Sequence, residues 1–251
     1  MHVLVLGGTG EAREIAGALA ARPGLRITLS LAGRTRDPAL APCAVRTGGF
    51  GGPAGLAEWM FAQGVGALID ATHPFASVIS ANARTAAARA GVPLVVLDRL
   101  RWEPVPGDRW TPVPDVAAAV AALGREPRRV FLAIGRQEVA AFRAAPQHRY
   151  LVRSIEPVPP DDLPPLAETL LARGPFSEAD EAMLLSAHRI EILVAKNSGG
   201  DATFGKLGAA RRLGLPVVML DRQPRPDAAP TVAAALERFD HLAASAIDRG
   251  V

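Results

Sequence analysis

The chain has 251 residues, of which 49% are hydrophobic, enough for one large domain or two small ones with sizeable cores. Its net charge of +3 comes from scattered basic residues, and only 5% of the residues are aromatic. Nucleic-acid binding needs a concentrated basic stripe, often with stacking aromatics. We therefore expect no nucleic-acid partner, and an acidic small-molecule substrate would explain the basic balance as well.

Cysteine and histidine usage argues against two further kinds of site. The single cysteine, Cys43, cannot form an internal disulfide and suits a reducing compartment. The five histidines stand at no metal-ligand spacing, so we expect no metal. The first residues resemble a buried strand rather than a signal peptide, and no apolar stretch approaches the ~20 residues of a membrane span. We expect a cytoplasmic monomer without a membrane partner.

The chain opens on an apolar run, Val3–Leu6, which predicts a strand buried on both faces. Three glycines and a helical pattern follow, and this unit offers backbone N–H groups and a positive helix end to a phosphate. Gly8 and Gly10 match the first two glycines of G-x-G-x-x-G, but Arg13 replaces the third. An ordinary strand-to-helix turn is the alternative. The residues predicted to hold a cofactor pyrophosphate are Gly8, Thr9, Gly10, Glu11 and Ala12.

The second predicted strand, Arg26–Leu31, lacks the Asp or Glu that usually ends this strand in NAD-binding Rossmann units and holds the ribose 2′-hydroxyl. It runs into Gly33, Arg34 and Arg36 instead, and guanidinium groups favour a 2′-phosphate through charge-assisted bonds. Gly33 and Arg34 therefore predict NADPH if the first loop binds a dinucleotide. A solvated basic loop is the alternative.

The remaining elements of the first half follow in order. A short strand precedes Thr47–Gly52, where four glycines surround one Phe and could pass close to a flat ring such as adenine or form a plain turn. The next predicted elements are a helix over 53–63, a strand over 66–70, a loop over 71–76, a helix that ends before Gly91 and a strand over 92–97. A proline-rich linker, Arg99–Pro114, then leads to a helix over 115–123 that Asp115 would cap.

The two halves of the chain repeat each other. Gly91–Arg99 reappears as Gly214–Arg222, and strands near 130–134 and 192–195 match those near 3–7 and 67–70 at nearly equal spacing. The repeat predicts an α/β protein with two Rossmann-like parallel-sheet domains of similar plan and the active site in the cleft between them. We expect residues 1–114 to bind NADP(H) and residues 115–251 to bind the substrate.

The second half lacks the phosphate glycines, because Gly135 is followed by Arg136, Gln137 and Glu138. The segment that matches the 71–74 loop is Lys196–Lys206, which holds the only two lysines of the protein. Ligands of open α/β sheets bind beyond the carboxyl ends of the strands, so both loops are candidate site segments. The alternative is that Ser198 or Asp201 caps the following helix.

Four segments together resemble the precorrin-6A reductase family of cobalamin biosynthesis. They are Gly7–Glu11, Asp70–Ala76, Gly135–Gln137 and Lys196–Gly200. Other enzyme classes lack their signatures here: there is no Tyr-x-x-x-Lys pair, no Gly-x-Ser-x-Gly elbow and no G-x-x-x-x-G-K-[ST] loop. The resemblance spans the whole chain, in order.

The resemblance implies NADPH-dependent reduction of one ring double bond of precorrin-6A, a flat tetrapyrrole with acetate and propionate groups, to precorrin-6B. Thr72, His73 and Arg136 would then contact the cofactor. The residues implied for the substrate are Lys196, Asn197, Ser198, Gly199, Gly200 and Lys206. Asp201 and His73 are the candidate proton donors, although a substrate carboxyl group or water could also serve.

Two alternatives remain open. One is the same reaction on cobalt-precorrin-6A, since its metal would arrive within the substrate and need no protein ligands. The other is a non-catalytic NADP(H)-sensing protein with a protein partner, which would leave Lys196–Lys206 without a role.

Overall fold

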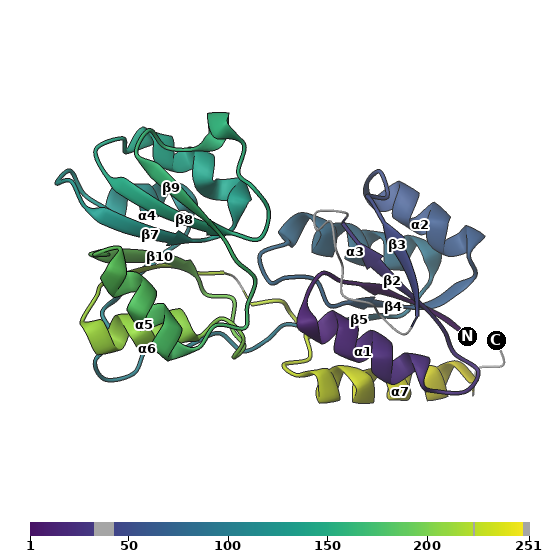
Figure 1. Cartoon of the computed structure of the whole chain (residues 1–251). Helices are drawn as coiled ribbons and strands as arrows, with labels where there is room; N and C mark the ends of the chain where they lie inside the picture. Colours follow the sequence, from purple (N-terminus) through teal and green to yellow (C-terminus); the bar gives the residue numbers. More distant parts are fainter. Residues whose placement is uncertain (33–42, 223, 248–251) are drawn as a thin grey trace. The chain divides into compact units, whose positions relative to one another are not determined.

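The computed structural model describes residues 1–32, 43–222 and 224–247, and the chain divides into two compact units (Figure 1). Unit 1 comprises Met1–Leu100 and Pro224–Val251, and unit 2 comprises Arg101–Gln223. Each unit has its own sheet, and all the strand pairs are parallel. Among the described helices, none combines the length and apolar character needed to cross a bilayer.

Unit 1 has a five-stranded sheet in the order β3-β2-β1-β4-β5. Its elements are β1 (His2–Leu6), α1 (Gly10–Ala20), β2 (Arg26–Leu31), β3 (Ala44–Thr47), α2 (Gly52–Ala62), β4 (Val65–Asp70), α3 (Ser77–Ala90), β5 (Leu94–Val96) and α7 (Val232–Ile247). Side chains of a strand alternate between the two faces, so Val3 and Val5 pack toward α1 and α7 while Leu4 and Leu6 pack toward α2 and α3. The predicted first strand is therefore confirmed as buried on both faces.

Unit 2 has a six-stranded sheet in the order β6-β11-β10-β7-β8-β9. Its elements are β6 (Trp110–Val113), α4 (Val116–Ala122), β7 (Arg129–Ala133), the 3-10 helix η1 (Arg136–Ala144), β8 (Arg149–Ser154), the 3-10 helix η2 (Pro160–Asp162), β9 (Ala167–Leu171), α5 (Glu178–Ala187), β10 (Ile192–Lys196), α6 (Gly205–Leu213) and β11 (Val217–Leu220). One face of this sheet packs against α5 and α6, with Phe131 and Leu193 at the centre of that core.

The two sheets share one plan, which confirms the predicted fold class. The order β3-β2-β1-β4-β5 in unit 1 corresponds to β9-β8-β7-β10-β11 in unit 2. The matched glycines play the same part in both units: Gly91 ends α3 with φ 63° just before β5, and Gly214 ends α6 with φ 66° just before β11. A left-handed φ at a helix end favours glycine, because other residues meet a steric penalty there.

The unit boundaries differ from the predicted division at 114 and 115. Part of the expected linker is strand β6, which pairs with β11, so unit 2 begins at Arg101. The last helix, α7, returns to unit 1, where Ala229 forms a bridge with Leu97 and Phe239 packs into the core. The chain therefore crosses between the units twice. Each crossing supplies a segment beside the last strand of a repeat, and local periodicity does not reveal which sheet such a segment joins.

Candidate active site

The glycine loop of unit 1 is shaped by close packing on one side and open space on the other. A Cβ at Gly7 would lie 2.6 Å from Leu29 Cδ1 and 3.0 Å from Ala12 Cβ, so a larger residue would force the Leu29 side chain to move. Gly8 has φ +121°, a conformation that side chains disfavour. A Cβ at Gly8 or Gly10 would meet no described atom within 4 Å. The loop therefore leaves room above the amides that begin α1, which have no partners within the helix.

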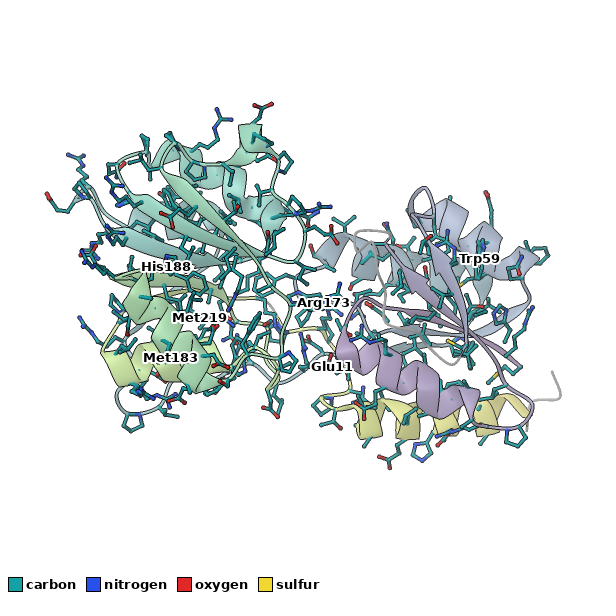
Figure 2. The ribbon with its side chains drawn as sticks, in the orientation of Figure 1. Glu11, Trp59, Arg173, Met183, His188 and Met219 are labelled. Carbon is teal, nitrogen blue, oxygen red and sulfur yellow. The ribbon has the colours of Figure 1, made fainter. Side chains whose placement is uncertain are left out.

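Thr9 and Glu11 use their side chains to hold this loop. The Thr9 hydroxyl accepts from Ala12 N at 3.1 Å, which caps α1, and donates to Ala71 O at 2.9 Å, which joins the loop after β4. Glu11, on the first turn of α1 (Figure 2), pairs with Arg99 at 2.7 Å. Burial raises the pKa of Glu11, but its own amide, Arg99 and Thr9 outweigh burial and lower it. Any phosphate contact at these two positions is therefore left to the backbone amides.

The loop after β4 has a buried polar core. Asp70 is 1% exposed, and its Oδ1 accepts from Thr72 N at 3.1 Å and from Thr72 Oγ1 at 2.6 Å. The same hydroxyl lies 3.2 Å from Ser80 Oγ. Thr72 thus stabilises the loop from inside. Of the two residues predicted on this loop, Thr72 and His73, only His73 is exposed, and its Nδ1 accepts from Phe75 N at 3.2 Å.

Arg225, in the segment where the chain returns to unit 1, was not among the predicted site residues. Its Nη2 donates to His73 O at 2.9 Å and to Pro74 O at 3.3 Å, and its Nη1 lies 3.5 Å from Asp70 Oδ2. Its own amide donates to Asp98 Oδ2 at 3.1 Å. One side chain therefore holds two adjacent carbonyl groups of the 71–76 loop. The sequence offered only an arginine between two prolines as a sign.

Two other cofactor predictions have different outcomes. Gly33 and Arg34 lie outside the described residues. In the glycine-rich loop, the Arg46 guanidinium lies 3.7 Å from the Phe50 ring centroid and donates to Gly48 O. The Phe50 and Trp59 rings make an edge-to-face contact, with their centroids 5.6 Å apart. Phe50 is thus already stacked, and this favours the plain turn over an adenine contact.

In unit 2, Gly135 follows β7 with φ +81°, and Arg136 begins η1. Glu138 on that helix accepts from Lys196 Nζ at 2.5 Å, which links η1 to the end of the neighbouring strand β10. The other oxygen of Glu138, Oε2, is buried and has no hydrogen-bond partner among the described residues. Lys196 is therefore paired with Glu138, a carboxylate for which the sequence indicated no role.

The segment after Lys196 is tied to the first crossing. Asn197 is buried, and its side chain bonds both main-chain groups of Trp102. Ser198 is buried as well, and its amide donates to Lys196 O at 2.8 Å. Gly199 and Gly200 have φ values of +66° and +78°. These placements make Asn197 a support for the loop rather than a substrate-facing residue.

The structure contradicts the alternative reading, in which Ser198 or Asp201 caps the next helix. The N-cap residue of α6 is Phe204, and no side chain caps it. Asp201 is exposed, and its carbonyl accepts from Phe204 N at 3.0 Å. Among the residues predicted on this loop, Asp201 is therefore an exposed acid that the helix does not use as a cap.

Lys206 lies in the interior of unit 2, where it is 3% exposed. Its Nζ donates to Thr203 O and lies 4.8 Å from the Trp102 ring centroid. Burial, and then the charge of Arg153, lowers the pKa of Lys206 to about 7, against the opposing charge of Glu181. Because Lys206 is buried, the prediction that it contacts the substrate directly is corrected. Its ammonium group instead supports the loop by bonding to Thr203 O.

The signature segments thus follow equivalent strands, β1 and β4 in unit 1 and β7 and β10 in unit 2. Within the described ranges, no group of three or more His, Cys, Asp or Glu side chains could hold a metal ion. Among the described residues that were predicted for the site, those that remain exposed or half-buried are Gly8, Thr9, Gly10, Glu11, His73, Arg136, Lys196, Gly200 and Asp201.

Comparison with known proteins agrees with this arrangement. A family model described as Precorrin-6x reductase CbiJ/CobK matches residues 2–240. Precorrin-6A reductase from Sinorhizobium sp is 53% identical over 242 residues, 96% of this chain and 92% of that protein. Precorrin-6A reductase from Rhodococcus erythropolis is 53% identical over 231 residues, 92% of this chain and 93% of that protein.

A solved structure named CobK precorrin-6A reductase matches with a TM-score of 0.91 and 48% identity, and the match covers 96% of this chain and 97% of that chain. Cobalt-precorrin-6A reductase from Priestia megaterium is more distant, at 25% identity over 177 residues, 66% of this chain and 69% of that protein. The family model and these relatives cover nearly the whole chain, and the chain therefore belongs to the precorrin-6x reductase family CbiJ/CobK.

Proposed function

We infer that this chain is an oxidoreductase of cobalamin biosynthesis that reduces precorrin-6A, and we propose NADPH as its reductant. The observation that carries this is the 53% identity to proteins named precorrin-6A reductase, over more than nine-tenths of each chain. Identity to two relatives named cobalt-precorrin-6A reductase is lower, at 25% and 29%, which favours the metal-free substrate.

The glycine loop fits the pyrophosphate of a dinucleotide. Gly8 and Gly10 leave open space, and the first turn of α1 offers amides and a positive helix end. The ion pair with Arg99 offsets the repulsion between the Glu11 carboxylate and a phosphate. Gly33 and Arg34 are proposed for the 2′-phosphate. When bound, the nicotinamide supplies the hydride, and the protein's task is to align it with the acceptor carbon.

Binding the acetate and propionate groups of the substrate requires positively charged side chains that are accessible to a ligand. Arg136 and Lys196 are both half-buried. Arg136 follows β7, and Lys196 is the last residue of the adjacent strand β10. We propose that they bind substrate carboxylates, each bond contributing about 1.5–3 kcal/mol. Glu138 holds the Lys196 ammonium at one position, which orients it for a second carboxylate.

A proton must reach the second carbon of the reduced bond. Asp201 and His73 are proposed donors, because both are exposed on signature loops. The Nδ1 atom of His73 accepts from Phe75 N, so the neutral ring carries its proton on Nε2. That atom is the one from which His73 would donate.

The test is incubation of the purified protein with precorrin-6A and NADPH. Two quantities are measured: the oxidation of NADPH, and the loss of one double bond in the product. Parallel reactions use NADH and cobalt-precorrin-6A. We expect turnover with precorrin-6A and NADPH. Tetrapyrrole binding without any NADPH oxidation would refute the reductase assignment, and faster turnover of the cobalt substrate would move the protein to the other branch.

A further inference from the structure

Trp102, the second residue of unit 2, is bound through its main chain by the loop that follows β10, residues 197–204. Its amide donates to Asn197 Oδ1 at 2.8 Å, and its carbonyl accepts from Asn197 Nδ2 at 3.0 Å. One amide side chain therefore satisfies both backbone groups of Trp102, which is 9% exposed. This arrangement sets the position of the loop where it leaves β10.

The indole ring of Trp102 contacts the same loop farther along. Its Nε1 donates to Gly200 O at 3.0 Å, its ring centroid lies 6.0 Å from that of Phe204 in an edge-to-face contact, and Lys206 Nζ lies over its face. The backbone at Gly199 and Gly200 follows left-handed conformations that glycine enters freely and can also leave freely. The hydrogen bond from the indole therefore selects one path for a segment with little preference of its own.

We propose that Trp102 is a positioning residue for substrate binding, which holds residues 196–204 in the shape that receives the carboxylates of the tetrapyrrole. The proposal rests on the proposed function, because the ligand is the substrate named there. A loop that is already ordered loses less conformational entropy when the substrate binds than a loop that must become ordered at that moment. Loss of the bond should thus raise the KM for precorrin-6A and leave the KM for NADPH unchanged.

The chain offers a matched control in Trp110, on strand β6 of the same unit. Its ring packs against the same hydrophobic core as Trp102, but its buried Nε1 has no hydrogen-bond partner among the described residues. Trp102→Phe and Trp110→Phe make the same change in volume. Only the first removes a bond to the signature loop.

The experiment compares the two variants in the full-length protein. Steady-state kinetics give kcat and KM for precorrin-6A and for NADPH, and hydrogen exchange of peptides covering 196–204 reports the order of the loop without turnover. One neutral hydrogen bond corresponds to about a 3- to 10-fold change in an equilibrium constant. We expect a rise of that size in the KM for precorrin-6A and faster loop exchange in Trp102→Phe, with both values within twofold of wild type in Trp110→Phe.

Three outcomes would overturn the proposal. They are equal effects in the two variants, faster loop exchange without a change in KM, and equal rises in KM for substrate and cofactor. If Trp102→Phe does not fold, Phe204→Leu removes the edge-to-face contact that orients the indole on the loop, and a rise in the KM for precorrin-6A with an unchanged KM for NADPH is expected. A wild-type protein that does not turn over precorrin-6A would instead refute the proposed function itself, and the proposal with it.

Discussion

Replacing Lys206 with methionine removes a buried ammonium group while keeping a side chain of similar length in the core. Lys206 is 3% exposed and faces the Trp102 ring and the Thr203 carbonyl, with the Arg153–Glu181 ion pair nearby. Burial is the main cause that lowers the pKa of Lys206 from 10.5 to about 7; Arg153 lowers it further, and Glu181 opposes both. Methionine packs as an unbranched apolar chain and carries no titratable group.

The pKa of Lys206 is lower in the folded state than in the unfolded state, so the unfolded chain binds the additional proton between about pH 7 and 10.5. The free energy of unfolding of the wild type should therefore rise with pH in this window. Each pH unit is worth about 1.36 kcal/mol once the folded-state lysine is neutral, which gives a rise of about 2 kcal/mol between pH 7 and 8.5. Lys206→Met should lack this rise.

Other groups with shifted pKa values contribute little between pH 7 and 8.5, the range of the assay. Burial lowers the pKa of His2 and of His148 from 6.5, so both titrate below it. Burial raises the pKa of the Cys43 thiol from 9.0, so its contribution begins near pH 9, above the range of the assay.

The assay is urea unfolding followed by tryptophan fluorescence at several pH values from 7 to 8.5, with linear extrapolation to water. Arg212→Met, at an exposed position of the same helix, controls for the loss of one positive charge. We expect the control to follow the wild-type pH dependence and Lys206→Met to be flatter by about 2 kcal/mol over the range. Identical slopes for all three proteins would show that Lys206 stays charged when folded and would refute this account of its burial.

Three further predictions concern the proposed site. Arg34→Ala should weaken NADPH about 10- to 100-fold in a fluorescence titration, the value of one charge-assisted bond, and leave NADH nearly unchanged; equal losses would remove the 2′-phosphate role. Lys196→Ala, made together with Glu138→Gln so that no carboxylate is left unpaired, should raise the KM for precorrin-6A at least about tenfold at an unchanged Tm, and wild-type kinetics would take Lys196 out of the site. Arg225→Gln should speed hydrogen exchange in residues 71–76 and raise the KM for NADPH about 3- to 10-fold, because it loses bonds to the His73 and Pro74 carbonyls; unchanged exchange would show that the loop is held without it.

Much of the fold follows from the sequence, because the signals involved are local. The apolar run Val3–Leu6 forms a strand buried on both faces, Asp115 caps α4 by accepting from Ala118 N, and Gly91 and Gly214 end their helices. Each of these depends on hydrophobic period, backbone conformation or capping within a few residues. The repeat of such signals was enough to predict two parallel-sheet domains, and the specific loop motifs were enough to indicate the family.

What only the tertiary structure decided involves residues far apart in the chain. Arg225 bonds to His73 across 152 positions, Trp102 bonds to Asn197 across 95, and Lys196 pairs with Glu138 across 58. No local pattern encodes such pairs, and none shows that β6 and α7 join the sheets reached by the two crossings. Burial of Lys206 is decided in the same way, since its neighbours come from several separate segments. A sequence can therefore indicate which loops form the site, whereas packing decides which of their side chains face a ligand and which hold the loop in place.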